Sequence, residues 1–156
     1  MITDQILKGH ELFATMTVDE IHELSKFTSE KEFKAGETIF EYMQVCAHFY
    51  MLNEGVVYLQ LPAQPSEFSF AISKIAKGEL FGLSPLLNAT RYTATAKCYE
   101  ATKVLSIEAK PFRELLQSNC PVGLTIINQV ASIYYARYLN ILKKLQDIVS
   151  QVSMVR

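Results

Sequence analysis

The spacing of apolar residues changes twice along the chain. Between residues 12 and 27, apolar side chains recur every three to five positions, which is typical of an amphipathic helix. Thr17 is followed three residues later by Glu20. This pair forms a capping box, in which each side chain satisfies an amide at a helix start. We therefore expect a helix that begins at this box and ends near Ser25.

From residue 30 to residue 108 the apolar spacing approaches two, which predicts β-strands. The segment HFYMLNEGVVYLQL, residues 48–61, is typical of a hairpin with its turn at residues 53–55. Residues 91–108 favour a second hairpin around Glu100-Ala101. Pro62 and Pro65 open a loop and end a strand ladder. About seven or eight short strands with regular turns indicate a small barrel, a double-stranded β-helix or jelly roll. The fold class is therefore mainly β with α.

The chain becomes helical again after Lys110. Pro111 suits the first turn of a helix that runs to Ser118, and Asn119-Cys120-Pro121 breaks it. A long helix then spans residues 121–152. Its apolar residues follow a 4-3 spacing that predicts a coiled-coil seam and a parallel homodimer. This seam consists of Ile127, Ala131, Tyr134, Tyr138, Ile141, Leu145, Ile148 and Val152.

Packing of the long helix along its own barrel is the alternative to a dimer seam. It explains the first half of the helix, which is apolar nearly all round. It explains the second half less well, because polar residues there occupy every face except the seam. We therefore favour a dimerisation helix.

Composition and charge exclude several classes of protein. The chain has 156 residues, of which 49% are hydrophobic, and this suits a single domain over residues 1–156. Within it, residues 10–118 hold the helix and the barrel, and residues 121–152 form the dimer helix. A net charge of −1 gives no basic footprint for nucleic acid. Without a signal peptide or a long apolar run, a cytoplasmic location without membrane association is expected.

The cysteines and histidines are scattered. Cys46, Cys98 and Cys120 form no C-x-x-C pair, so reduced thiols are expected instead of a metal site. A metal enzyme on a small barrel would need a clustered set such as H-x-H, and the sequence has none. We therefore expect no metal ligands, no catalytic residues and no enzymatic activity.

One segment carries candidate chemistry for an anion: GELFGLSPLLNATRYTATA, residues 78–96. Gly82 allows a close approach of the backbone, and Ser84-Pro85 can start a short helix. Arg91 follows as a lone positive charge. The alternative for Arg91 is a solvated arginine in a surface loop, paired with Glu79. For Leu83 the favoured interpretation is a core leucine.

Taken together, these segments resemble the cyclic-nucleotide-binding domain family, which includes the bacterial catabolite activator protein and the regulatory subunit of protein kinase A. The resemblance covers residues 10–145. LFATMTVDEIHELSKF is similar to the leading helix of that family, FKAGETIF to its first glycine turn and HFYMLNEGVVYL to its F-Y-x-L-x-x-G-x-V hairpin. GELFG followed by an arginine resembles its phosphate-binding cassette. PFRELLQSNC and the long helix resemble its last two helices.

The resemblance implies a ligand site made by residues 82–93. Gly82 and Ser84 would cradle a cyclic phosphate, with the helix amides facing it. Arg91 would neutralise the phosphate, and Thr93, after the intervening Tyr92, would supply the nearest hydroxyl. Leu83 stands where the family has a glutamate that accepts a hydrogen bond from ribose. Losing that bond costs about 1.5–3 kcal/mol, which weakens the binding of cyclic AMP or cyclic GMP.

Two further departures mark the cassette as degenerate. It is about a residue short between Leu83 and Arg91, and Met43 stands where the family usually has a glycine. In the family, the long helix closes over the base of the nucleotide. Tyr134 and Tyr138 are therefore candidates for base contact, although interface residues are the favoured interpretation.

Three functions remain open. The first is a regulatory sensor that binds a cyclic nucleotide and signals through the dimer helix. The second is a degenerate domain without nucleotide, retained for homodimerisation or for binding a protein partner. The third is a sensor of an anion that lacks ribose. Transcription factors of this family carry a helix-turn-helix domain after the dimer helix; none follows here, so direct DNA binding is not expected.

Overall fold

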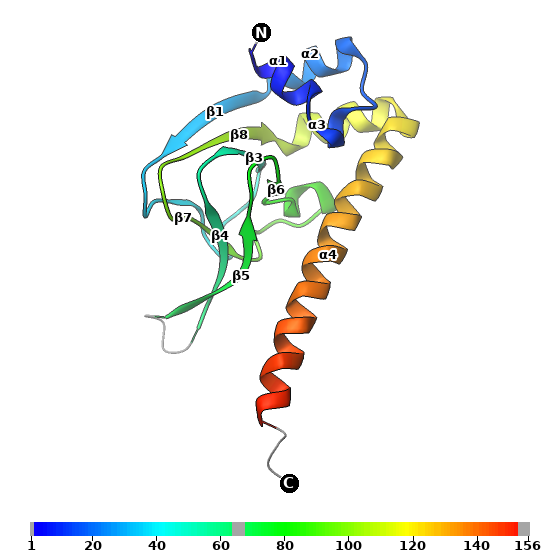
Figure 1. Cartoon of the computed structure of the whole chain (residues 1–156). Coiled ribbons are helices and arrows are strands. Elements are labelled where there is room, and N and C mark those ends of the chain that lie inside the picture. The colour runs from blue at the N-terminus through cyan, green and yellow to red at the C-terminus, as the bar shows by residue number, and fades with distance from the viewer. Residues whose placement is uncertain (1, 64–67, 153–156) are drawn as a thin grey trace.

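The computed structural model describes residues 2–63 and 68–152. Its strands form two antiparallel sheets of four strands each, in the orders β1-β8-β3-β6 and β2-β7-β4-β5 (Figure 1). This arrangement confirms the predicted jelly-roll class. The strands are β1 (Thr28–Phe33), β2 (Thr38–Phe40), β3 (His48–Glu54), β4 (Val57–Pro62), β5 (Ser69–Ile75), β6 (Leu80–Phe81), β7 (Thr95–Cys98) and β8 (Thr102–Glu108).

Helices precede and follow the strands. They are α1 (Ile2–Lys8), α2 (Val18–Lys26), α3 (Ala109–Ser118) and α4 (Cys120–Val152), with short 3-10 turns η1 (Glu11–Phe13) and η2 (Ser84–Leu87). The capping box at α2 is confirmed: the Glu20 amide donates to the Thr17 hydroxyl at 3.2 Å, and the Thr17 amide donates to the Glu20 carboxylate at 2.8 Å. The predicted break between α3 and α4 is also confirmed. Helix α1 was not predicted.

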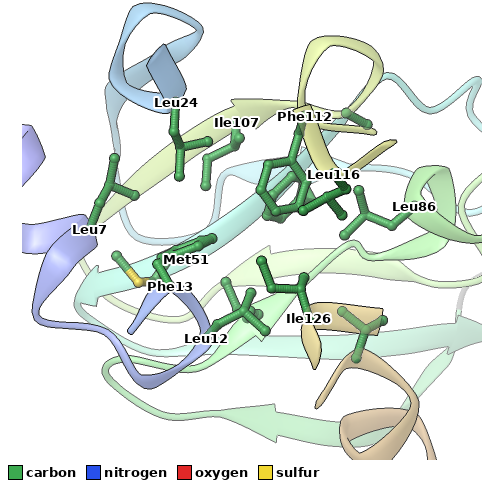
Figure 2. Packing of buried hydrophobic residues seen from close by; sticks show 14 of the residues in the cluster. Leu7, Leu12, Phe13, Leu24, Met51, Leu86, Ile107, Phe112, Leu116 and Ile126 are labelled. Carbon is green, nitrogen blue, oxygen red and sulfur yellow. The ribbon is translucent and has the colours of Figure 1, made fainter. Parts of the chain in front are cut away.

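Strand β3 is buried on both faces, and this gives the molecule its layers. Phe49 and Met51 belong to a core shared with the helices, whereas Tyr50 and Leu52 belong to the core between the two sheets. In the helical core, Met51 and Ile107 lie among side chains from α1, η1, α2, α3 and α4 (Figure 2). The β1-β8-β3-β6 sheet is therefore the middle layer, covered by helices on one side and by the second sheet on the other.

The two hairpins that the sequence predicted are wrong. Strand β3 pairs with β6 and β8, whereas β4 pairs with β5 and β7, so the turn at residues 53–55 crosses between sheets. Strands β7 and β8 likewise lie in different sheets. Gly55 makes the first crossing at φ +99°, and a Cβ there would lie 2.6 Å from the carbonyl oxygen of Ala101. The two corners pack against each other, and the direct hairpin is β4–β5.

The end of β4 agrees with the sequence. The strand ends at Pro62, which pairs with Ser69 at the end of the ladder, as proline at a strand terminus predicts. Pro65 lies outside the described residues.

Helix α4 begins tightly packed and ends exposed. Gly123 lies so close to α3 that a Cβ would approach the Leu116 carbonyl oxygen to 2.7 Å, and Ile126 and Val130 are fully buried. Farther along, α4 passes η2 and runs beyond the sheets (Figure 1). Ile127 and Tyr134 of the predicted seam pack partly against the chain's own core. The other seam residues are exposed: Ala131, Tyr138, Ile141, Leu145, Ile148 and Val152.

Gly55→Ala should destabilise the fold by about 2–4 kcal/mol, because the added methyl group combines backbone strain with overlap at the second corner. Gly36→Ala is the matched control. Gly36 also has a positive φ, +87°, but nothing lies within 4 Å of its Cβ position. The Gly36→Ala variant should lose only about 1–2 kcal/mol of its free energy of unfolding. Urea unfolding measures both, and an equal loss in the two variants would contradict the corner packing.

Candidate ligand-binding site

Gly82 is required by the chain's own aromatic side chains. Its φ is +66°, and a Cβ there would lie 2.9 Å from the Phe40 ring and 3.1 Å from the Tyr50 ring. The close approach of the Gly82 backbone to a ligand phosphate stays a prediction. The groups that approach this glycine in the structure are these two rings.

A column of rings fills the interior beside Gly82. Tyr92 stacks on Phe40 with ring centroids 3.8 Å apart and an interplanar angle of 15°, and Phe40 stacks in turn on Tyr50 and Phe81. The Tyr92 hydroxyl donates to the His48 carbonyl at 2.6 Å. Burial raises the pKa of the Tyr92 phenol, so it stays neutral at physiological pH. Tyr92 therefore offers an aromatic surface without a charge.

The predicted short helix after Gly82 is confirmed as the 3-10 turn η2. Pro85 lies in its first turn, and Asn88 ends it in the left-handed region at φ +60°. Arg113 of α3 holds this turn by donating to the Pro85 carbonyl at 3.2 Å and to the Asn88 side-chain oxygen at 3.1 Å. Leu83 is 1% exposed and packs in the helical core, which agrees with its interpretation as a core leucine.

Arg91 holds a turn of the chain. Its side chain is exposed, and Nη1 donates to the Met43 carbonyl at 2.7 Å. Met43 has φ +66°, the left-handed region that favours glycine, which fits its place at a family glycine position. Its amide donates to the Tyr92 carbonyl at 3.0 Å. The partner of Arg91 is thus a backbone carbonyl, not Glu79, and its role in anion binding stays a prediction.

A cavity of about 190 Å³ lies between the sandwich and α4. Five residues of the predicted ligand site line it, together with Tyr134, Tyr138 and Ile141 of the predicted seam; the five are Gly82, Leu83, Ser84, Tyr92 and Thr93. Arg91 is not among its lining residues. The structure thus brings most of the predicted site to one cavity and leaves the predicted phosphate-binding arginine outside it.

Sequence reasoning missed several residues of this cavity. Its apolar walls include Phe40, Leu59 and Ile72, and its one arginine is Arg137 of α4. Arg137 is half-buried, and Nη2 donates to the Leu80 carbonyl. The signal in the sequence was its position, because Arg137 is the lone charge within the apolar half of the long helix, on the same face as Tyr134.

Burial shapes the charge at this wall. It lowers the pKa of the Arg137 guanidinium, while the nearby charge of Glu79 opposes that change. Burial also raises the pKa of the Tyr134 phenol, and the Ser84 hydroxyl partly offsets the effect. Arginine stays protonated in proteins, so the cavity wall carries one positive charge.

Within residues 2–63 and 68–152, no three His, Cys, Asp or Glu side chains gather in a way that could hold a metal ion. No helix in that part of the chain is long and apolar enough to cross a bilayer.

Comparisons with solved structures agree with this fold. A Geobacter metallireducens protein named for cyclic nucleotide binding is 26% identical, with a TM-score of 0.76 over 88% of this chain and 99% of the other. The sensor domain of the transcriptional regulator DNR from Pseudomonas aeruginosa is 19% identical, with a TM-score of 0.77 over 88% and 91%. The regulatory domain of Toxoplasma gondii PKA, crystallised with cAMP, is 21% identical, with a TM-score of 0.71 over 84% and 49%.

Among curated protein sequences, no significant match to this chain is found. The family profile described as the cyclic nucleotide-binding domain matches residues 30–119, from the first strand to the end of α3. The chain therefore belongs to the cyclic nucleotide-binding domain family.

Proposed function

We propose that this chain is a non-catalytic sensor module in which a small anionic molecule binds between the sandwich and α4. The observation that carries the proposal is the shared cavity. One wall is made by Gly82, Ser84 and Thr93, and the other by Tyr134 and Arg137 of α4. A molecule in this cavity touches both parts, so its presence changes the free energy with which α4 packs on the sandwich.

Membership of the family supports a regulatory role, and cyclic AMP or cyclic GMP is the first ligand to consider. Three features argue against the binding of a cyclic nucleotide here. Leu83 is buried and cannot accept from ribose, Arg91 is engaged by the Met43 carbonyl, and the cavity volume is about 190 Å³. Ligand cavities usually measure about 300–1,000 Å³. A smaller anion that lacks ribose therefore suits the site better.

A second candidate is a degenerate domain that binds no nucleotide and serves homodimerisation or a protein partner. The contact between Arg91 and Met43 favours it, because the charge that the family uses for phosphate is already occupied by the chain itself. The aromatic column around Phe40 favours it too, since these rings take space beside Gly82 that a ligand would need.

We also propose that a second copy of the chain covers the exposed face of α4. On that face, exposed residues follow a 4-3 row, of which Tyr138 also lines the cavity. The row comprises Leu124, Asn128, Ala131, Tyr135, Tyr138, Leu142 and Leu145. Such spacing suits an identical helix in a coiled coil, and a single asparagine on such a row fixes register. This row shares Ala131, Tyr138 and Leu145 with the seam predicted from sequence. It has Asn128, Tyr135 and Leu142 where that seam has Ile127, Tyr134 and Ile141.

The ligand proposal predicts saturable stabilisation by cyclic AMP, cyclic GMP or a small organic acid. At 100 times the dissociation constant, a ligand should raise the free energy of unfolding by about 2.7 kcal/mol. Thr93→Trp should abolish the effect, because Thr93 is exposed at the cavity and a large ring there blocks it. Thermal unfolding and calorimetric titration measure both.

Arg91→Ala is the control for the location of the anion. Loss of binding in this variant would place the anion at the cassette arginine, as the family resemblance implies. Saturable binding that survives Thr93→Trp would argue against the cavity. If none of these ligands stabilises the protein at millimolar concentration, the second candidate function replaces the first.

The dimer proposal predicts that Leu142→Asp and Leu145→Asp each weaken self-association by about 100-fold, because a carboxylate would be buried between two apolar helices. Ile148→Asp is the matched control. Ile148 is 60% exposed and belongs to the seam predicted from sequence, but lies beside the row defined above. It should leave the dimer intact. Light scattering over a concentration series measures this. If Ile148→Asp dissociates the dimer and Leu142→Asp leaves it intact, the seam predicted from sequence is the interface instead.

A further inference from the structure

Arg137 lines the apolar cavity, and it also lines a second, more polar cavity together with Glu79 and Leu80. Its guanidinium donates to the Leu80 carbonyl. Among the residues that the structure describes, no carboxylate lies within ion-pair distance of it. Glu79 is exposed and acts on Arg137 only through its field. The guanidinium has five N–H donors in a planar fork, so most of its capacity for hydrogen bonds is unused by the carbonyl.

A half-buried cation without a counter-ion is costly, and an arriving anion relieves that cost. Burial also lowers the pKa of the Arg137 guanidinium, because its charged form is less stable away from water. The Ser84 hydroxyl lies on the same cavity wall and is hydrogen-bonded to Tyr134, so it holds the Tyr134 ring in place beside the cavity. Arg137 is thus the one charged residue that the described part of the chain places on the wall of this cavity.

The rest of the cavity is apolar and small. Phe40, Leu59, Ile72 and Tyr92 line it, and two of these four side chains are aromatic. A cavity of about 150 Å³ is large enough to bind benzene. At about 190 Å³, this one holds a single ring with a short substituent. Aromatic rings pack favourably against Phe and Tyr side chains, by stacking or edge to face, so a flat aromatic body is the best match to these walls.

We propose that Arg137 binds the carboxylate of a single-ring aromatic acid, whose ring lies against Phe40 and Tyr92. This rests on the proposed function, because it names the class of ligand that the shared cavity takes. A carboxylate matches the guanidinium fork through two parallel hydrogen bonds. It carries one charge for one arginine, whereas a phosphate monoester would bring a second charge into an apolar cavity with no second cation on its wall.

The test compares acids with neutral molecules of the same shape. Benzoate and phenylacetate, and separately benzamide and phenylacetamide, are titrated into the wild-type protein. Binding is measured by two-dimensional NMR of the backbone N–H groups and by thermal shift. Each acid should bind at least tenfold more tightly than the matching neutral amide. Binding should shift the backbone N–H signals of residues near Gly82 and Tyr138. Arg137→Gln should weaken the acids about 10- to 100-fold and leave the amides unchanged. Arg91→Gln, the matched control, should leave the acids unchanged.

Arg137→Lys guards against a merely structural loss, because it keeps the charge and removes the fork. It should bind the acids with an affinity between those of the wild type and Arg137→Gln. If acid binding is lost in Arg91→Gln and kept in Arg137→Gln, the inference is overturned and the anion belongs at the cassette. Equal binding of acids and amides also overturns it, because no anion is then recognised.

The remaining outcomes separate this inference from the proposed function. If cyclic nucleotides stabilise the protein and the aromatic acids do not, the ligand class is wrong while the sensor proposal stands. If neither kind of molecule binds, both fall together.

Discussion

The close packing of α4 against α3 determines what the rest of that helix can do. Gly123 allows the two backbones to approach, and Ile126 and Val130 then bury their side chains completely. A helix is stiff over a few turns, so this anchor fixes the direction of every later side chain. Arg137 consequently lies at the cavity, and Leu142 is exposed. A larger residue at position 123 would move both.

Local signals predicted the helix boundaries well. The Thr17–Glu20 box and the break at Asn119–Pro121 depend on neighbours within a few residues, and the structure has both. The prediction of the two hairpins was wrong because a tight turn between two β-rich segments has the same local pattern whether the strands pair with each other or enter different sheets. Only contacts across the fold, such as Gly55 against Ala101, decide between these outcomes. Helix α1 was missed for a related reason, since it is short and its buried Leu7 depends on tertiary packing.

The candidate site was predicted in part for similar reasons. The segment from Gly82 to Thr93 was recognised from its glycine, proline and arginine, and five of its six candidate residues line the cavity. The direction of Arg91 could not be read from the sequence, because it is set by a carbonyl 48 residues away. The role of Arg137 was hidden by the apolar pattern around it. The same pattern left the exposed row of α4 undetermined, since a helix that is apolar nearly all round permits two neighbouring registers.

The two arginines have different consequences for signalling. Arg91 closes a turn within the sandwich, so an anion bound there would act first on the sandwich itself. Arg137 belongs to α4, so an anion bound there would stabilise the position of the helix directly. Binding free energies are reciprocal: whatever holds α4 against the sandwich also raises the affinity for that anion, by the same factor. A second copy on the exposed face therefore changes ligand affinity only if it prefers one position of α4 over another. A partner that accepts both positions equally would make a stable dimer that transmits nothing.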